Sequence, residues 1–464
     1  MAQKKIVILN GKRNGDEDLD AILTLLTEVL QKHEDCEPQI FPLRNIRINH
    51  CIGCFNCWYK TPGKCIHNDS GADILQAVLN SETVIFFTPV VFGGYSSELK
   101  KILDRFLPIV LPLFKYTAHQ ETRHIQRYVT FPRIIGIGVH PNPSQGVSRC
   151  FKLLVGRNAA NCISSSYAAE VISSMAPHET LKCRFQALLS KKDKLPELKV
   201  FPSLIEETAS VPQLKKNNNN PRALLVIGSP KIKSPSTSTV LGNTLLEKLK
   251  MYGWRTEKLI LNGHLNDKKE QDNLYKAVYR SDNIILSFPL YVDTLPFLVT
   301  RAFEVIMQHK EKLTNRRTKK ILTLVNNGYP EVNHNLVALM ICQNFAIECE
   351  MTWMGGLALG GGEGLLSGQP VTGMTGLKGL KRPPLYYVNR ALNLTAEALA
   401  EGHPVPQKAV QLMAKKPFPL IPFNLWRWIY IFVANNISKK EVTKNGLNNE
   451  AIFNRHYYQS NSQK

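Results

Sequence analysis

Runs of apolar residues alternate with amphipathic stretches through the first 200 residues of the chain. The apolar runs are rich in Val, Ile, Leu and Phe and have the length of buried strands. We expect strands at residues 5–9, 39–43, 83–88, 133–139 and 168–172. The stretches between some of these runs show the spacing of amphipathic helices, which we expect at about 18–32, 71–79 and 96–107.

The same order of segments returns in the second half of the chain. Strands are expected at residues 223–227, 256–261, 283–288, 320–326 and 351–359, and helices at about 238–252 and from about 295 onward. A polar, Asn-rich stretch that ends in proline separates the halves and has the composition of a linker. We predict a first domain over 1–205, a linker over 206–221, a second domain over 222–414 and a C-terminal extension over 415–464.

Strands that alternate with helices form parallel sheets that are covered by helices on both faces. The predicted fold class is therefore α/β, with two tandem doubly wound parallel sheets, each within a three-layer α/β/α arrangement. Ligands of such folds bind at the carboxyl ends of the strands, where the strand order reverses. The loops that follow the predicted strands are thus the places where functional residues are expected.

Composition and charge narrow the class of protein. Of the 464 residues, 44% are hydrophobic and 20% are charged, which is typical of a globular protein. The net charge of +21 is spread over both halves, so we expect a basic surface that attracts anionic cofactors, and no nucleic-acid partner. We expect no membrane span and no secretory signal, and hence a cytoplasmic protein whose ten cysteines are not in disulfides.

Four cysteines lie in one short loop that follows the second predicted strand. They are Cys51, Cys54, Cys57 and Cys65, in the spacing C-x2-C-x2-C-x7-C. Thiolates at this spacing can hold one iron–sulfur cluster. Ligation of a structural zinc ion, or free thiols, are alternatives that the spacing leaves open.

The first loop of the second half has the composition of a phosphate-binding turn. It presents glycine, a cation and several hydroxyls ahead of a predicted helix, at Gly228, Ser229, Lys231, Ser236, Thr237 and Ser238. Hydroxyls and unpaired N–H groups at a helix N-terminus suit a monophosphate. The equivalent turn of the first half, residues 10–18, carries two cations but no Ser or Thr, and its three carboxylates would repel a phosphate.

Two further loops have residues that suit a flat ligand. Glycines permit close backbone approach and aromatic side chains permit stacking. In the first half these candidates are Thr88, Pro89, Val90, Phe92, Gly93, Gly94 and Tyr95. At the equivalent place the second half has Pro289, Leu290, Tyr291 and Asp293.

With these motifs the chain resembles the NADPH-dependent FMN reductases and iron–sulfur flavoproteins of the flavodoxin-like superfamily. The resemblance rests on C-I-G-C-F-N-C-W-Y-K-T-P-G-K-C and T-P-V-V-F-G-G-Y in the first half, and on G-S-P-K, S-T-S-T and F-P-L-Y-V-D-T-L-P in the second. It implies two tandem flavodoxin-like domains, FMN held by the phosphate turn and the ring loops, and NAD(P)H as the hydride donor. It also implies a [4Fe–4S] cluster on the four cysteines.

The resemblance further implies an oxidoreductase that passes electrons to a small-molecule or protein acceptor. Relatives often build the flavin site across a subunit interface, so a homo-oligomer or an internal pseudo-dimer is expected. Which half binds FMN stays open. The competing functions are a non-enzymatic electron carrier, a thiol redox sensor, and a scaffold in which one or both halves have lost the flavin.

Overall fold

The structure, a computed structural model, describes residues 5–34, 36–117, 121–196, 221–231, 235–314, 318–366, 368, 371, 385–418 and 420–457. It divides into two compact units. Unit 1 comprises Met1–Glu197 together with Ile431–Lys464, and unit 2 comprises Leu198–Tyr430. The predicted linker lies outside the described residues except for Pro221. The stretch predicted as a C-terminal extension is shared between the units.

Unit 1 contains a five-stranded sheet whose neighbouring strands are all parallel. Its strands are β1 (Ile6–Asn10), β2 (Gln39–Pro42), β3 (Thr83–Pro89), β6 (Arg133–His140) and β7 (Tyr167–Ser173), in the order β2-β1-β3-β6-β7. Every predicted strand is present, with its ends within one residue of the prediction. Buried apolar strands are found reliably because their side chains face helices on both sides.

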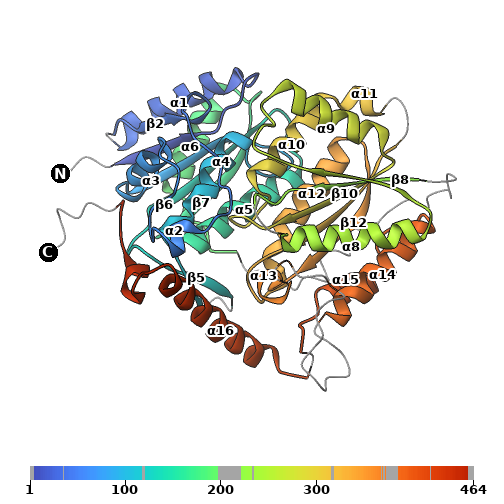
Figure 1. The fold of residues 1–464 in the computed structure, drawn as a ribbon. Coiled ribbons are helices and arrows are strands. Elements are labelled where there is room, and N and C mark those ends of the chain that lie inside the picture. The colour runs from blue at the N-terminus through green and yellow to red at the C-terminus, as the bar shows by residue number, and fades with distance from the viewer. Residues whose placement is uncertain are drawn as a thin grey trace. The chain divides into compact units, whose positions relative to one another are not determined.

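Helices cover both faces of the first sheet, as Figure 1 shows. They are α1 (Asp18–Glu34), α3 (Gly71–Leu79), α4 (Ser97–Leu103), α5 (Gln145–Cys162) and α6 (His178–Ser190). Ile135 and Ile137 share a core with α1 and α6. The alternate residue Gly136 faces α5, because a Cβ atom there would lie 2.4 Å from Val155. The sequence analysis did not predict α5 or α6.

One predicted helix is divided in the structure. The stretch expected as a helix over 96–107 begins as α4 and continues as a 3-10 helix, η2 (Asp104–Ile109). Pro108 lies within η2 and has no N–H group with which to continue an α-helical ladder. An antiparallel hairpin of β4 (Val110–Tyr116) and β5 (Thr122–Gln126) follows, and the sequence did not predict it.

Unit 2 repeats the topology of unit 1. Its strands are β8 (Arg222–Ile227), β9 (Arg255–Ile260), β10 (Asn283–Pro289), β11 (Lys320–Asn326) and β12 (Thr352–Leu359), in the parallel order β9-β8-β10-β11-β12. All five strands agree with the prediction to within one residue. Both sheets thus have the doubly wound order of the flavodoxin type, and the predicted fold class is confirmed.

Helices also cover both faces of the second sheet. The α-helices described between β8 and residue 414 are α8 (Thr237–Met251), α9 (Lys268–Arg280), α10 (Phe297–Gln308), α11 (Lys310–Thr314), α12 (Leu336–Glu348), α13 (Gly362–Leu366), α14 (Tyr386–Ala400) and α15 (Gln407–Met413). Gly242 of α8 lies against Leu225 of β8. On the other face, Phe303 of α10 stacks on Phe345 of α12 with ring centroids 3.8 Å apart.

The last long helix, α16 (Phe423–Lys444), begins in unit 2 and ends in unit 1. Trp426 and Tyr430 are buried, whereas Trp428 is 64% exposed. A short 3-10 helix, η4 (Asn449–Phe453), follows it. Among the described residues, no helix has both the length and the apolarity needed to cross a bilayer.

Candidate functional site

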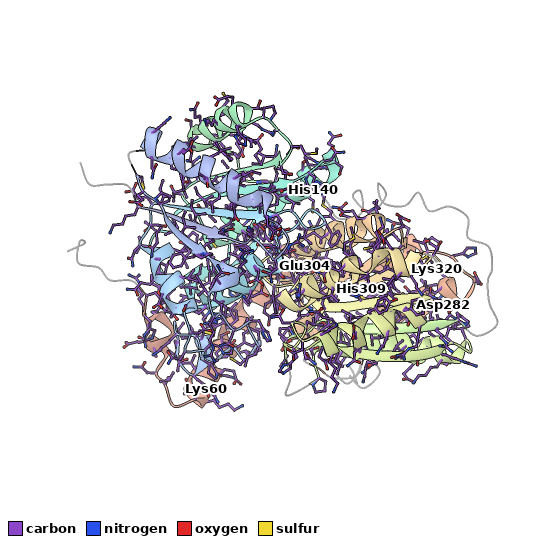
Figure 2. The ribbon with its side chains drawn as sticks, turned by 90° about the horizontal axis from the view of Figure 1, so that it is seen from above. Lys60, His140, Asp282, Glu304, His309 and Lys320 are labelled. Carbon is purple, nitrogen blue, oxygen red and sulfur yellow. The ribbon has the colours of Figure 1, made fainter. Side chains whose placement is uncertain are left out.

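The predicted phosphate turn lies at the point where the strand order of unit 2 reverses. The strands β8 and β10 are neighbours in the sheet. The connection after β8 leads to β9 on one side, and the connection after β10 leads to β11 on the other side, so the loops after β8 and β10 diverge here. The first of these loops leads into α8, and the second contains the ring candidates of unit 2. This is where flavodoxin-type folds bind their ligand. Asp282 and Lys320, labelled in Figure 2, lie at the amino ends of β10 and β11, which is the end of the sheet away from these loops.

Most hydroxyls of the turn have structural partners. The Oγ atom of Ser236 accepts a hydrogen bond of 3.1 Å from the N–H group of Thr239 and so caps α8. Thr237 donates to the carbonyl oxygen of Gly362 at 3.2 Å. Ser238 accepts from Nδ2 of Asn326 at 2.8 Å. These bonds join the start of α8 to the loops that follow β11 and β12.

The remaining polar groups of this turn are Ser229 and Lys231. Ser229 is 7% exposed, and its Oγ atom lies 3.4 Å from the N–H group of Lys231. The Lys231 Nζ atom lies 3.3 Å from the carboxylate of Glu363, and the side chains of both residues are partly exposed. Gly228 is required sterically, because a Cβ atom there would lie 2.1 Å from Val299. Sequence analysis did not identify Glu363, which lies 132 residues from Lys231.

The ring loop of unit 2 forms a tight turn with an unusual backbone. The N–H group of Tyr291 donates to the carbonyl oxygen of Thr294 at 2.9 Å, and the N–H group of Thr294 donates to the carbonyl oxygen of Tyr291 at 3.1 Å. Val292 and Asp293 between them have φ angles of 46° and 60°. A β-branched residue in this left-handed region is strained, and such strain is often found at ligand sites. Pro289, Leu290 and the two residues after them are half-buried, whereas Asp293 is 2% exposed.

Unit 1 has the same turn after β3. Val91 and Gly94 exchange backbone hydrogen bonds of 3.0 and 2.8 Å, and Phe92 and Gly93 have φ angles of 55° and 87°. The predicted ring residues of this loop are all buried: Thr88, Pro89, Val90, Phe92, Gly93, Gly94 and Tyr95.

Tyr95 points into the interior of unit 1. Its ring makes edge-on contacts with Phe86 and Phe151, at centroid distances of 5.9 and 5.8 Å. Its hydroxyl donates to Oδ1 of Asn158 at 2.8 Å. The structure therefore places Tyr95 in the core beside α5.

The first turn of unit 1 neutralises its own cations. Lys12, which is 3% exposed, forms an ion pair with Asp20. Arg13 donates two hydrogen bonds of 3.0 Å to the carboxylate of Asp16. Both cations have carboxylate partners, as Lys231 does in unit 2, but this turn also has no Ser or Thr hydroxyl, so it is less suited to a phosphate than the turn of unit 2.

The four cysteines of the loop differ in burial but influence one another. Cys57 is buried on the short helix α2 (Asn56–Tyr59), Cys51 and Cys65 are half-buried, and Cys54 is exposed. Burial raises the pKa of Cys51 to about 12, and the nearby charges of Asp104, Cys65 and Cys54 add to this effect. Burial also raises the pKa of Cys57, with further contributions from the other three thiols.

The thiols thus contribute to one another's pKa values. Lys60, labelled in Figure 2, marks the loop just after α2. Within the part of the chain that the structure describes, no three His, Cys, Asp or Glu side chains are arranged to hold a metal ion.

Two buried arginines accompany the thiols. Arg105 donates hydrogen bonds of 3.0 Å to each carboxylate oxygen of Asp69. Burial opposes ionisation of Asp69, but the hydrogen bonds from Arg105 and from the N–H group of Asn49 lower its pKa to about 2. The charges of Cys65 and Cys51 also raise the pKa of Arg105. The second arginine is Arg127, whose charge lowers the pKa of Cys57 and so partly offsets the effect of burial.

The C-terminal part of unit 1 lies on the cysteine loop. The N–H group of Cys65 lies 3.4 Å from the hydroxyl of Tyr457. Gly63 lies against the carbonyl oxygen of Asn454, since a Cβ atom at Gly63 would be 2.6 Å from it. Sequence analysis did not foresee this contact, because nothing in the local pattern links residues almost 400 positions apart.

Residues 4–120 match the family of NADPH-dependent FMN reductases. The predicted family resemblance is confirmed for this segment. It contains the cysteine loop and the ring loop of unit 1, whereas Arg127 and the C-terminal part of unit 1 lie beyond it.

Curated relatives of the chain carry the name iron–sulfur flavoprotein. One from Methanocaldococcus jannaschii is 37% identical over 76 residues, which is 16% of this chain and 38% of the relative. Another, from Archaeoglobus fulgidus, is 30% identical over 108 residues, or 23% of this chain and 46% of the relative. The chain therefore spans less than half the length of these relatives. An FMN-dependent NADH-azoreductase structure from Bacillus anthracis aligns with 39% of this chain and 99% of its own, at 11% identity and a TM-score of 0.28.

Proposed function

We propose that the chain is an NAD(P)H-dependent flavin oxidoreductase that binds FMN at the strand-order reversal of unit 2. The observation that carries the proposal is the joint position of residues 228–231 and 235–238 and of the Pro289–Asp293 loop at neighbouring strand ends in a flavodoxin-type sheet. The family match of residues 4–120 supports the reaction class.

The residues of unit 2 have separable roles in this proposal. The first N–H groups of α8 and the ammonium group of Lys231 bind the phosphate, which competes with Glu363 for that cation. The turn at Tyr291–Thr294 orients the ring, because its backbone is held by two hydrogen bonds. FMN, when bound, supplies the capacity to accept a hydride from NAD(P)H.

We also propose that Cys51, Cys54, Cys57 and Cys65 hold a [4Fe–4S] cluster in unit 1. The support for this proposal is the donor set of four thiols at the spacing C-x2-C-x2-C-x7-C, together with relatives that carry the name iron–sulfur flavoprotein. Within the described residues the thiols are not arranged to hold a metal ion. The cluster, when bound, supplies one-electron transfer. The thiols must lose their protons to bind iron. Burial opposes this loss at Cys51 and Cys57 because it raises their pKa values, whereas the charge of Arg127 favours the thiolate of Cys57. The electron acceptor is a small molecule or a protein.

The test is to purify the full chain anaerobically, measure FMN, iron and zinc per chain, and follow flavin absorbance after rapid mixing with NADPH or NADH. We expect one FMN per chain, four iron atoms and rapid bleaching. A colourless protein that cannot be reconstituted with FMN would contradict the flavin assignment. Retained flavin that neither nucleotide reduces would favour the electron carrier over the reductase, and zinc in place of iron would exclude the cluster.

A further inference from the structure

One face of α16, the long dark-red helix of Figure 1, is both exposed and apolar along its first turns. Four of its large apolar side chains are exposed: Leu425 by 50%, Trp428 by 64%, Phe432 by 59% and Val433 by 47%. Residues that are three, four or seven positions apart lie on the same side of a helix. These four residues therefore form one continuous surface, here called the exposed face of α16. Leu420, just before the helix, is 98% exposed.

The opposite side of α16 is used for packing within each unit. The hydroxyl of Tyr430 donates to the carbonyl oxygen of Gly328 at 2.7 Å within unit 2. Within unit 1, Ser438 donates to the carbonyl oxygen of Pro112 at 2.8 Å, and Val442 is completely buried. The helix is therefore held by its other side, and internal packing does not account for the apolar residues of the exposed face.

Trp428 is the one exposed tryptophan of the five in the chain, all of which the structure describes. The other four are at most 9% exposed: Trp58, Trp254, Trp353 and Trp426. The indole ring has an apolar body and one polar N–H group. Tryptophan is therefore enriched at the boundary between lipid headgroups and acyl chains.

Positive charge accompanies the exposed face. Residues 402–440 contain no Asp or Glu. Lys439 and Lys440 are exposed, and they follow Phe432 and Val433 by seven residues, which places them two turns further along the same side of the helix. The next carboxylate, that of Glu441, pairs with Lys444 at 3.7 Å. An apolar surface that continues into a basic one is complementary to a bilayer that carries anionic headgroups.

We propose that the exposed face of α16 docks on the surface of an anionic lipid bilayer. The apolar side chains enter the boundary between headgroups and acyl chains, and Lys439 and Lys440 meet the phosphate groups of the lipids. The helix lies on this surface and does not cross it. A second copy of the chain is a poorer occupant, because residues 402–440 offer no carboxylate to these lysines. The proposal does not depend on FMN or on the cysteine loop.

The experiment is cosedimentation of the full chain with vesicles of phosphatidylcholine alone and of phosphatidylcholine mixed equally with phosphatidylglycerol. The variant Trp428→Ala/Phe432→Ala removes apolar area from the exposed face. Its matched control is Met175→Ala/Met251→Ala, since these methionines are 80% and 86% exposed elsewhere on the chain.

A second pair of variants tests the charge. Lys439→Gln/Lys440→Gln removes two cations beside the exposed face. Lys268→Gln/Lys269→Gln removes two exposed cations at the start of α9 and keeps the same net charge as the first variant. Circular dichroism checks that every variant is folded, which is expected because all the substituted side chains are exposed.

We expect the unsubstituted chain to bind the anionic vesicles more strongly than the neutral ones. Trp428→Ala/Phe432→Ala should lower the partition coefficient at least tenfold on the anionic vesicles, because two large apolar side chains no longer enter the lipid. Lys439→Gln/Lys440→Gln should lower it about tenfold at low salt and less at high salt. Both control variants should stay within about twofold of the unsubstituted chain.

Tryptophan fluorescence locates the contact. Lipids brominated on their acyl chains should quench the unsubstituted protein, and Trp428→Phe should lose most of this quenching while it still binds. Three results would overturn the proposal: no binding to anionic vesicles, equal binding by Trp428→Ala/Phe432→Ala, or a dimer in sedimentation velocity that this variant dissociates. The last result would assign the exposed face to a second copy of the chain. None of these results bears on FMN content, so the flavin assignment is tested separately.

Discussion

The Nη1 atom of Arg127 donates a hydrogen bond of 2.8 Å to the carbonyl oxygen of Asn454, which lies 327 residues further along the chain. Other contacts reinforce this link. Val442 of α16 and Ile452 share a buried apolar cluster with Leu111 and Leu113. Residues 442–454 are therefore an integral part of the unit that carries the cysteine loop.

Truncation of Val442 should destabilise unit 1. Val442 is completely buried, and Val442→Ala removes apolar contacts and leaves a cavity, at a cost of about 2–3 kcal/mol. The matched control is Val433→Ala on the same helix, because Val433 is 47% exposed and its truncation should change stability by less than about 0.5 kcal/mol. Urea unfolding followed by circular dichroism measures both. Equal effects of the two substitutions would show that the end of α16 does not pack on this unit.

The ion pair of Asp69 and Arg105 should make stability depend on acid pH. Both side chains are at most 2% exposed, so Asp69→Asn leaves a buried guanidinium without its counter-charge and should cost about 3–5 kcal/mol. The pKa of Asp69 falls from 3.8 to about 2 on folding, so its contribution is complete above about pH 4 and is lost as the pH falls towards 2.

The measurement for this ion pair is urea unfolding at a series of pH values from 2 to 7. The control is Asp73→Asn, since Asp73 is exposed at the start of α3. The difference between Asp69→Asn and the unsubstituted protein should shrink below pH 4. A difference that stays constant over the whole series would mean that the carboxylate charge is not what stabilises this region.

Lys231→Gln should weaken FMN binding. Removal of one partly exposed cation beside the phosphate should raise the dissociation constant about fivefold to tenfold, or ~1 kcal/mol. Arg13→Gln alters the corresponding turn of unit 1, where the cation is paired with Asp16, and should leave the constant unchanged. Fluorescence quenching of FMN during titration with apoprotein measures both. The reverse result would assign the flavin to unit 1.

Tyr95→Phe should affect stability but not flavin binding. The substitution removes the hydroxyl that donates to Asn158 inside unit 1, and should cost about 1–3 kcal/mol because the amide oxygen stays buried. FMN per chain should stay equal to that of the unsubstituted protein. A loss of FMN with unchanged stability would instead support the interpretation in which Tyr95 stacks on the ring.

The ring loops of the two units differed in how far the sequence could predict their turns. The glycine pair after β3 indicated a tight turn, because glycine adopts positive φ angles without strain. The same turn in unit 2 contains Val292 and Asp293, whose positive φ angles oppose their intrinsic preferences. Only the surrounding structure, including the paired backbone bonds of Tyr291 and Thr294, holds them there.

The sequence by itself determined the two sheets and the order of their strands along the chain. Most strands of both sheets are nearly continuous buried runs, and that local pattern is sufficient because such strands are covered on both faces. The edge strands β2 and β9 are instead largely exposed or half-buried. It also determined which loops carry cysteines, hydroxyls and glycines. Each of these features depends only on residues that are neighbours in the chain.

Tertiary structure alone decided which of those residues are available for chemistry. In the folded chain, the hydroxyls of Thr237 and Ser238 form hydrogen bonds to other loops. Tyr95 lies in the core of unit 1. The carbonyl oxygens of Ile452 and Asn454 accept hydrogen bonds from Arg127. These outcomes depend on contacts between segments tens to hundreds of residues apart. Such contacts leave no periodic pattern in the chain, because their free energy comes from burial and from pairing across the fold, which no short window of sequence contains.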